Sequence, residues 1–248
     1  MGEHTIREVL KRRSDDTQRV IRRRRERATK RSAAKHTSQG VLIALMITVL
    51  VILAALGYMG WLTHEIDSHF VADRTANALG RNRVTLNLQT TTQFLPNTLL
   101  AAMDPNFYNN SNMTLSPLTS RLVRGYFPDA SAPSIATMSV ALQLRYSRTD
   151  ILEAFINDVN LGRHNGQPVR GFAAASLVYF KKPFVQLQPQ DIALLVALAA
   201  DPGDVESLGN QGKVLALRNA ILQMDAQQNV LSQTQVDALK KSPLDLAP

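Results

Sequence analysis

The stretch TDILEAFINDVNLGRHNGQPVRGFAAASLVYFKKPF, residues 149–184, decides the fold class of this chain. Its first part has the apolar spacing of one helix face, on a helix that begins after Ser147 and ends at Gly162. The apolar positions of that face are Ile151, Leu152, Phe155, Ile156 and Val159. Its second part, residues 170–180, is rich in small side chains, which permit close approach of neighbouring helices. We therefore expect this stretch to belong to a helical domain.

The sequence after this stretch continues the helical pattern. Residues 192–200 (IALLVALAA) are apolar on every side, which is typical of a buried central helix. A later apolar run predicts an amphipathic helix and consists of Val214, Leu215, Leu217, Ile221 and Leu222. Ser232 and Gln235 have the spacing of a capping box at the start of a last helix. The predicted fold class is mainly α, with one core of about 150 ordered residues.

Nearer the N-terminus, residues 41–62 (VLIALMITVLVILAALGYMGWL) contain no charged side chain. A helix of this length spans about 33 Å, enough to cross a hydrocarbon layer of roughly 30 Å. Tyr58 and Trp61 lie at its far end, where aromatic rings favour the headgroup region. A cleaved signal peptide is the alternative, but both this run and the segment before it are longer than that pattern. We expect a transmembrane helix.

The charge of the chain is concentrated before this helix. The whole chain has a formal charge of +8, and residues 1–40 alone have 13 basic and 5 acidic side chains, so the remainder is neutral. This split excludes a uniformly basic nucleic-acid-binding domain. Although Arg22 to Arg25 form a basic run, we expect the tail to be disordered and cytoplasmic, where it orients insertion and attracts anionic lipid. The chain has no Cys, which excludes disulfides and thiolate chemistry.

Residues 63–93 are expected to form a solvated stalk or extended linker. His64 and His69 are five positions apart, which does not place two metal ligands on one helical face. Residues 84–94 alternate apolar with polar side chains and are rich in Thr, which predicts a short strand or an extended segment.

Taken together, three segments resemble a known family. Residues 149–184, their continuation LQPQDIALLVALAADP to residue 202, and Arg218 resemble the C-terminal half of the peptidoglycan transglycosylase domain, glycosyltransferase family 51. Residues 94–108 (FLPNTLLAAMDPNFY) resemble the segment that leads into the family's first motif. The resemblance implies a lysozyme-like α-helical domain over residues 94–248, of the kind found in class A penicillin-binding proteins.

The residues that the resemblance would make catalytic are missing. The family's first motif runs Glu-Asp-x-x-Phe-x-x-His-x-Gly, and here Asp104 and Phe107 match. Met103 occupies the position of the family's general-base Glu, Asn110 occupies the position of its His, and Asn112 occupies the position of its Gly. A thioether cannot accept the proton of the acceptor hydroxyl.

The second half of the active site is also altered. The family's second motif has no counterpart between Tyr126 and Ser147, and Ile135 or a neighbour stands where the family has its second catalytic Glu. No Glu occurs from Phe70 to Asp150. Glu153 matches a position that we expect to be structural. We therefore expect no catalytic residues in this degenerate site.

The resemblance leaves some cations that could meet a pyrophosphate. The candidate substrate-binding residues are Asp104, Arg145, Arg170, Lys181 and Lys182, with Arg163 as a further cation. The alternative for Lys181 and Lys182 is an ordinary solvated helix end. We expect neither a cofactor nor a metal, because His64, His69 and His164 are scattered along the chain.

The sequence thus favours a pseudo-transglycosylase in the bacterial cytoplasmic membrane, with its C-terminal domain on the outer side. It would serve as a non-catalytic scaffold or regulator of peptidoglycan synthesis, with a class A penicillin-binding protein or another cell-wall synthesis protein as partner. Residual polymerisation of lipid II, lipid II binding without turnover and an eroded paralogue stay open as alternatives. Nucleic acid is not an expected partner.

Overall fold

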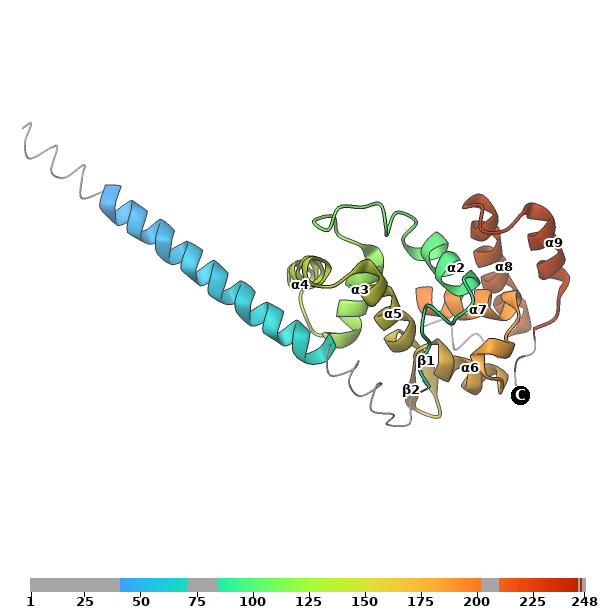
Figure 1. Cartoon of the computed structure of the whole chain (residues 1–248). Helices are drawn as coiled ribbons and strands as arrows, with labels where there is room; N and C mark the ends of the chain where they lie inside the picture. The colour runs from blue at the N-terminus through green and yellow to red at the C-terminus, as the bar shows by residue number, and fades with distance from the viewer. Residues whose placement is uncertain (1–40, 71–83, 202–209, 245, 247–248) are drawn as a thin grey trace, which may run out of the picture. The chain divides into compact units, whose positions relative to one another are not determined.

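A computed structural model describes residues 41–70, 84–201, 210–244 and 246 (Figure 1). The chain divides into two compact units, Met1–Trp61 and Leu62–Pro248. The predicted basic tail, residues 1–40, lies outside the described residues.

The first described element is a single helix, Val41–Phe70, which is long and apolar enough to cross a membrane. Its side chains are exposed from Val41 to Trp61, as expected of a helix whose apolar surface contacts lipid. The rings of Tyr58 and Trp61 stack with centroids 6.0 Å apart near the end of the apolar run. The structure thus contains the candidate membrane helix that the sequence predicts.

This helix does not give way to a solvated stalk at residue 63. It continues to Phe70, and Leu62, Ile66 and Phe70 are buried in the core of the second unit. These three positions are spaced by four residues and therefore lie on one helix face. His64 and His69 are exposed. The predicted stalk is therefore wrong for residues 63–70, because their apolar face packs against the helical domain.

The second unit is mainly α, as predicted. After the first helix its elements are α2 (Phe94–Met103), α3 (Pro117–Tyr126), α4 (Ala132–Arg145), α5 (Arg148–Asp158), β1 (Asn160–His164), β2 (Gln167–Arg170), α6 (Phe172–Phe180), the short 3₁₀ helix η1 (Phe184–Gln186), α7 (Pro189–Ala200), α8 (Gln211–Gln227) and α9 (Gln233–Lys241). All residues of α7 from Asp191 to Ala199 are buried, and α2, α6, α8, α9 and β1 contact it (Figure 1). The predicted central helix over 192–200 is confirmed and starts one turn earlier, where Pro189 suits the first helical position.

The structure distinguishes the two alternatives predicted for residues 84–94, a strand or an extended segment. Residues 84–87 are not a strand, and the strands of the described residues, β1 and β2, make an antiparallel hairpin after α5. The side chain of Asn157 in α5 takes the place of a partner strand, because it accepts a hydrogen bond from Leu86 N and donates one to Leu86 O, both 2.8 Å long. Glu153 Oε2 accepts a 3.2 Å bond from Leu88 N. Glu153 therefore holds helix and loop together, the structural role expected for it.

The end of α5 also lies earlier than predicted. The helix ends at Asp158, and Gly162 is a residue of β1 with φ 106°. The pairing of Asn160 with Arg170 begins directly after the helix, and an irregularity in register between Asn160 and Arg163 accommodates the glycine.

Polar side chains fix the helix ends and join the helices. Ser147 caps α5, and Ser232 with Gln235 forms the predicted capping box of α9. Arg218 of α8 is buried and donates 2.7 Å hydrogen bonds to the carbonyls of Lys240 and Ser242, which satisfies carbonyl groups at the end of α9.

Candidate functional site

Asp104, the matching carboxylate of the degenerate motif, serves to join two helices. Met103 is the last residue of α2, and Asp104 directly follows it with only 3% of its surface exposed. Its Oδ2 accepts a 2.6 Å hydrogen bond from the hydroxyl of Ser116. Ser116 is in turn the N-cap of α3 and accepts a hydrogen bond from Thr119 N. The carboxylate therefore faces the junction of α2 and α3.

The loop after Asp104 is held against the ends of α4 and α5. Phe107 is fully buried, and the guanidinium of Arg148 lies 5.1 Å from its ring centroid. Arg148 also donates 3.2 Å bonds to the carbonyls of Asn110 and Ser111. Asn110 occupies the position of the family's His, and its backbone carbonyl helps to hold the loop by accepting the bond from Arg148.

A buried apolar side chain occupies the position expected for the second catalytic carboxylate. Ile135 in α4 is 2% exposed and belongs to the hydrophobic core. The chain passes from Tyr126 at the end of α3 to Ala132 at the start of α4 with Ser131 as N-cap. The connection between α3 and α4 is therefore short.

A cationic pocket lies elsewhere, between the C-terminal half of α3, the end of α5 and the hairpin. Its cavity volume is about 180 Å³. The lining residues are Arg121, Leu122, Arg124, Gly125, Tyr126, Phe155, Asp158, Val159, Asn160 and Arg170. We call it the arginine pocket. Three guanidinium groups and one carboxylate line it, so it has an excess of positive charge. Guanidinium groups bind phosphate and carboxylate oxygens in a bidentate manner.

The interactions within this pocket order its wall. Tyr126 donates a 2.8 Å hydrogen bond to Asp158 Oδ2, which holds the end of α3 to the end of α5. Burial lowers the pKa of the Arg121 guanidinium, and the carboxylate of Asp201 acts in the opposite direction. An arginine keeps its charge at neutral pH in spite of such a shift. The pocket can therefore hold an anionic group with an apolar neighbour.

Of the five candidate substrate-binding residues, Arg170 alone lines the arginine pocket. Arg145 pairs instead with Asp67, with Nη2 and Oδ2 2.6 Å apart. Lys181 caps the end of α6 in the left-handed conformation, with φ 54°, and Lys182 follows it there. Asp104 is buried at the junction of α2 and α3.

Sequence reasoning missed Arg121 and Arg124. The two are three residues apart in α3, so they lie on one helix face. That spacing was a usable signal, but it gave no indication that Arg170, far along the chain, would join them.

Comparisons with known proteins find a family model, sequence relatives and a solved structure that are similar to parts of this chain. Residues 134–225 match the family model described as a transglycosylase. Penicillin-binding protein 1B of Escherichia coli (strain K12) is 30% identical over 179 residues, which cover 62% of this chain and 21% of the relative. Penicillin-binding protein 1B of Buchnera aphidicola subsp. Baizongia pistaciae is 34% identical over 109 residues, which cover 44% of this chain and 15% of the relative. The crystal structure of penicillin-binding protein 1A from Haemophilus influenzae covers 66% of this chain and 18% of its own, at 20% identity and a TM-score of 0.45.

Fold and site together define a mainly helical domain with a cationic pocket, preceded by an apolar helix that can cross a membrane. Residues 134–225 match the transglycosylase family model, and the helical domain is similar to part of penicillin-binding protein 1B from two organisms. The chain spans about a fifth of the length of Escherichia coli penicillin-binding protein 1B.

Proposed function

We propose that this chain is a membrane-anchored, non-catalytic member of the transglycosylase family that acts as a scaffold or regulator in peptidoglycan synthesis. The observation that carries the proposal is the state of Asp104. It is the carboxylate next to the missing general base, and it is buried and bonded to Ser116. A general base must reach the hydroxyl that it deprotonates, and neither Met103 nor Ile135 can accept a proton.

A polymerisation assay tests the loss of catalysis. The full-length protein would be reconstituted in vesicles with lipid-linked disaccharide-peptide precursor, beside an active class A penicillin-binding protein as positive control. We expect no glycan polymer from this chain. Polymer made by the wild type and lost in Asp104→Asn would contradict the proposal and assign Asp104 a catalytic role.

The anchor and its orientation belong to the same proposal. The apolar helix and the basic residues 1–40 support a chain whose N-terminus is cytoplasmic and whose helical domain lies outside. Since the chain has no Cys, Val185→Cys and Ser32→Cys each provide one thiol for a membrane-impermeant maleimide. In intact spheroplasts Cys at position 185 should react, whereas Cys at position 32 should react only after lysis. The reverse pattern would contradict this topology.

The scaffold proposal also predicts that the chain binds a partner protein. Relatives named as penicillin-binding proteins support a cell-wall polymerase as the partner class. We expect a class A penicillin-binding protein to co-purify with the tagged full-length chain from detergent-solubilised membranes. The absence of any cell-wall synthesis protein from this material would count against the scaffold role.

A second function, binding of the lipid-linked precursor without turnover, is favoured by the arginine pocket. Its three guanidinium groups can meet the pyrophosphate and its apolar wall can meet the adjoining carbon chain. Arg170→Ala should weaken binding of the precursor or of a phosphoglycolipid transglycosylase inhibitor at least tenfold. Lys181→Ala, at an exposed site outside the pocket, is the matched control and should leave binding unchanged. Equal loss in both variants, or no binding by the wild type, would sink this second function.

A further inference from the structure

The segment that runs from the hairpin through α6 to η1 has charges of one sign only. From residue 159 to residue 190 the sequence contains no Asp or Glu. The basic side chains of this segment are Arg163, His164, Arg170, Lys181 and Lys182. Since the chain after the basic tail is neutral as a whole, this positive charge is local to one part of the helical domain. A local excess of one charge favours a partner of the opposite charge.

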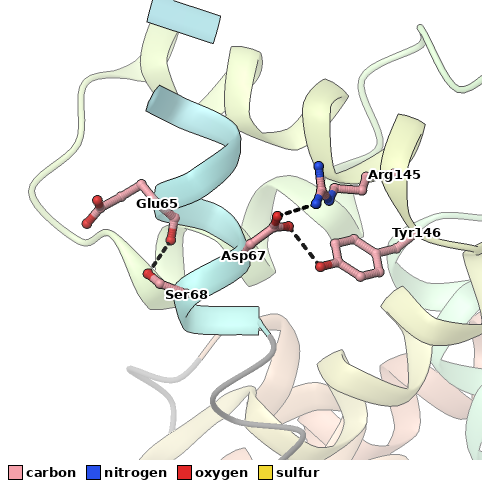
Figure 2. A network of polar contacts seen from close by, with 5 residues as sticks. All are labelled: Glu65, Asp67, Ser68, Arg145 and Tyr146. Atoms are coloured by element: carbon pink, nitrogen blue, oxygen red, sulfur yellow. Dashed lines mark hydrogen bonds and ion pairs between the residues drawn. The ribbon is translucent and has the colours of Figure 1, made fainter. Parts of the chain in front are cut away.

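Two of these cations differ from Arg145, a cation of α4 that has a partner within the domain. Arg145 pairs with Asp67, which also accepts a 2.8 Å hydrogen bond from the Tyr146 hydroxyl, as Figure 2 shows. In the part of the chain that the structure describes, no side-chain hydrogen bond or ion pair involves Arg170 or Lys181. Both side chains are therefore able to bind an anionic group from outside the domain.

A hollow with an apolar floor lies beside these cations, between β2 and α6, which contact each other (Figure 1). Its volume is about 280 Å³, and we call it the hairpin pocket. Its apolar lining includes Val169, Ala174 and Val178, and its polar lining includes His164, Gln167 and Arg170. Protein interfaces combine an apolar centre with a polar rim in the same way.

The outer face of α6 extends this apolar surface beyond the hairpin pocket. Ala174, Leu177 and Val178 are three or four positions apart and therefore lie on one face of the helix. None of them is buried, and Leu177 is 42% exposed. A helix without any charged side chain, as α6 is, is normally covered on every side. Its outer face is therefore typical of a surface that a partner covers.

The spacing of the cations indicates the kind of partner. Arg170 lines the hairpin pocket together with Ala174. Lys181 follows Ala174 by seven positions, which is about 10 Å along the helix axis. Carboxylates that meet both cations must therefore belong to different residues of a chain, because one headgroup or one free phosphate does not span this distance. The spacing favours a peptide segment.

We propose that the hairpin pocket and the outer face of α6 dock an acidic segment of a partner protein. One apolar side chain of the segment would fill the pocket, and carboxylates would bind Arg170 and Lys181. This inference rests on the scaffold role of the proposed function and names the chemistry by which the partner is recognised. Anionic lipid is the competing occupant, and the test separates the two.

Fluorescence anisotropy with the full-length chain in a neutral detergent tests the proposal. The probe is a fluorescein-labelled peptide in which Asp and Glu flank a central Leu, and its counterpart has Asn and Gln in their place. Gln167→Glu adds a negative charge at the rim of the hairpin pocket, and Ala174→Leu fills the pocket without a change of charge. Gln211→Glu is the matched control, because it adds the same charge at an exposed site at the start of α8. Neither Gln167 nor Ala174 lines the arginine pocket.

We expect the wild type to bind the acidic peptide about tenfold or more tightly than the uncharged counterpart. Gln167→Glu and Ala174→Leu should each weaken this binding by about threefold or more, whereas Gln211→Glu should leave it unchanged. Equal binding of the two peptides, or equal weakening by Gln167→Glu and Gln211→Glu, would overturn the proposal. Displacement of the peptide by short-chain phosphatidylglycerol at equal charge would assign the surface to lipid and overturn it as well. Thermal unfolding of each variant checks that the fold is retained.

This test is separable from the test of the scaffold role. If a class A penicillin-binding protein co-purifies with the chain but the acidic peptide does not bind, the docking surface is overturned and the scaffold role stands. If the acidic peptide binds as expected but no cell-wall synthesis protein co-purifies, the scaffold role fails and the site for an acidic segment stands.

Discussion

Asp225 in α8 is fully buried, and its Oδ2 accepts a 3.0 Å hydrogen bond from the hydroxyl of Thr98 in α2. Within the described residues, its Oδ1 has no hydrogen-bond partner. Burial raises the pKa of Asp225 to about 6, and the bond from Thr98 acts in the opposite direction. The ionised form is therefore disfavoured in the folded state, where one charged oxygen is buried without compensation.

This carboxylate makes stability depend on pH in a known direction. The folded pKa of about 6 exceeds the reference value of 3.8. The folded state therefore binds the proton more tightly, and stability rises as the pH falls from 7 toward 4. We expect Asp225→Asn, which stays neutral, to raise the free energy of unfolding at pH 8 by about 2–3 kcal/mol and to have little effect near pH 4.

Urea unfolding of the detergent-solubilised protein at several pH values measures this difference. Asp237→Asn is the control, because Asp237 is an exposed carboxylate in α9. A stability gain of Asp225→Asn that does not change with pH would show that its origin is not the ionisation of Asp225.

Among the secondary-structure elements, the step from the hairpin into α6 depends on Gly171. Its φ is 80°, and a Cβ atom there would lie 2.2 Å from the carbonyl oxygen of Asn157. Its amide N–H donates a 2.9 Å hydrogen bond to Val159 O. The close approach of α6 to the end of α5 therefore requires a residue without a side chain.

Two glycines with similar φ separate steric clash from backbone strain. Gly166 in the hairpin turn has φ 78° and nothing within 4 Å of an added Cβ. Gly166→Ala should cost about 1–2 kcal/mol, the strain of the left-handed region. Gly171→Ala should cost about 4 kcal/mol or more, because the backbone of α5 must shift as well. Thermal unfolding compares the two, and equal losses would mean that the contact with Asn157 is easily relieved.

The last turns of the N-terminal helix offer a second test of element packing. Ile66 is 2% exposed, and His64 lies on the exposed side of the same helix. Ile66→Ala should lower the free energy of unfolding by about 2–5 kcal/mol through the cavity that it leaves. His64→Ala should change it by less than about 0.5 kcal/mol. A small effect of Ile66→Ala in chemical unfolding would show that residues 62–70 do not stabilise the domain.

For the whole molecule, the boundary of the folded domain lies at Leu62 and not at the first helix of the transglycosylase-like region. Leu62, Ile66 and Phe70 are all buried, and each contributes about 1.5–3 kcal/mol of burial. Their sum is a large part of the roughly 5–15 kcal/mol by which a domain is stable.

Two fragments test this boundary. Residues 62–248 should give a soluble protein with a cooperative thermal transition. Residues 71–248 should aggregate or melt without cooperativity, because the core surface that the three side chains cover becomes exposed. Circular dichroism melting and size-exclusion chromatography distinguish the two, and equal stability of both fragments would contradict the role of residues 62–70.

The sequence by itself determined what depends on local patterns. The helix of α5, the buried α7 and the caps at Ser147 and Ser232 follow from the spacing of apolar residues and from which side chains can satisfy the first N–H groups of a helix. The candidate membrane helix follows from its length without charge. The expectation that Met103 cannot serve as a general base needs no structure either, because a thioether accepts no proton in any fold.

The tertiary structure alone decided how distant segments meet. It brought Arg170 beside Arg121 and Arg124, placed Arg145 on Asp67, and bonded the backbone of Leu86 to the side chain of Asn157. The physical reason is that a charge or an amide has no fixed partner in the sequence. Packing of the chain decides which polar groups are buried together, and these buried groups must then form hydrogen bonds with one another.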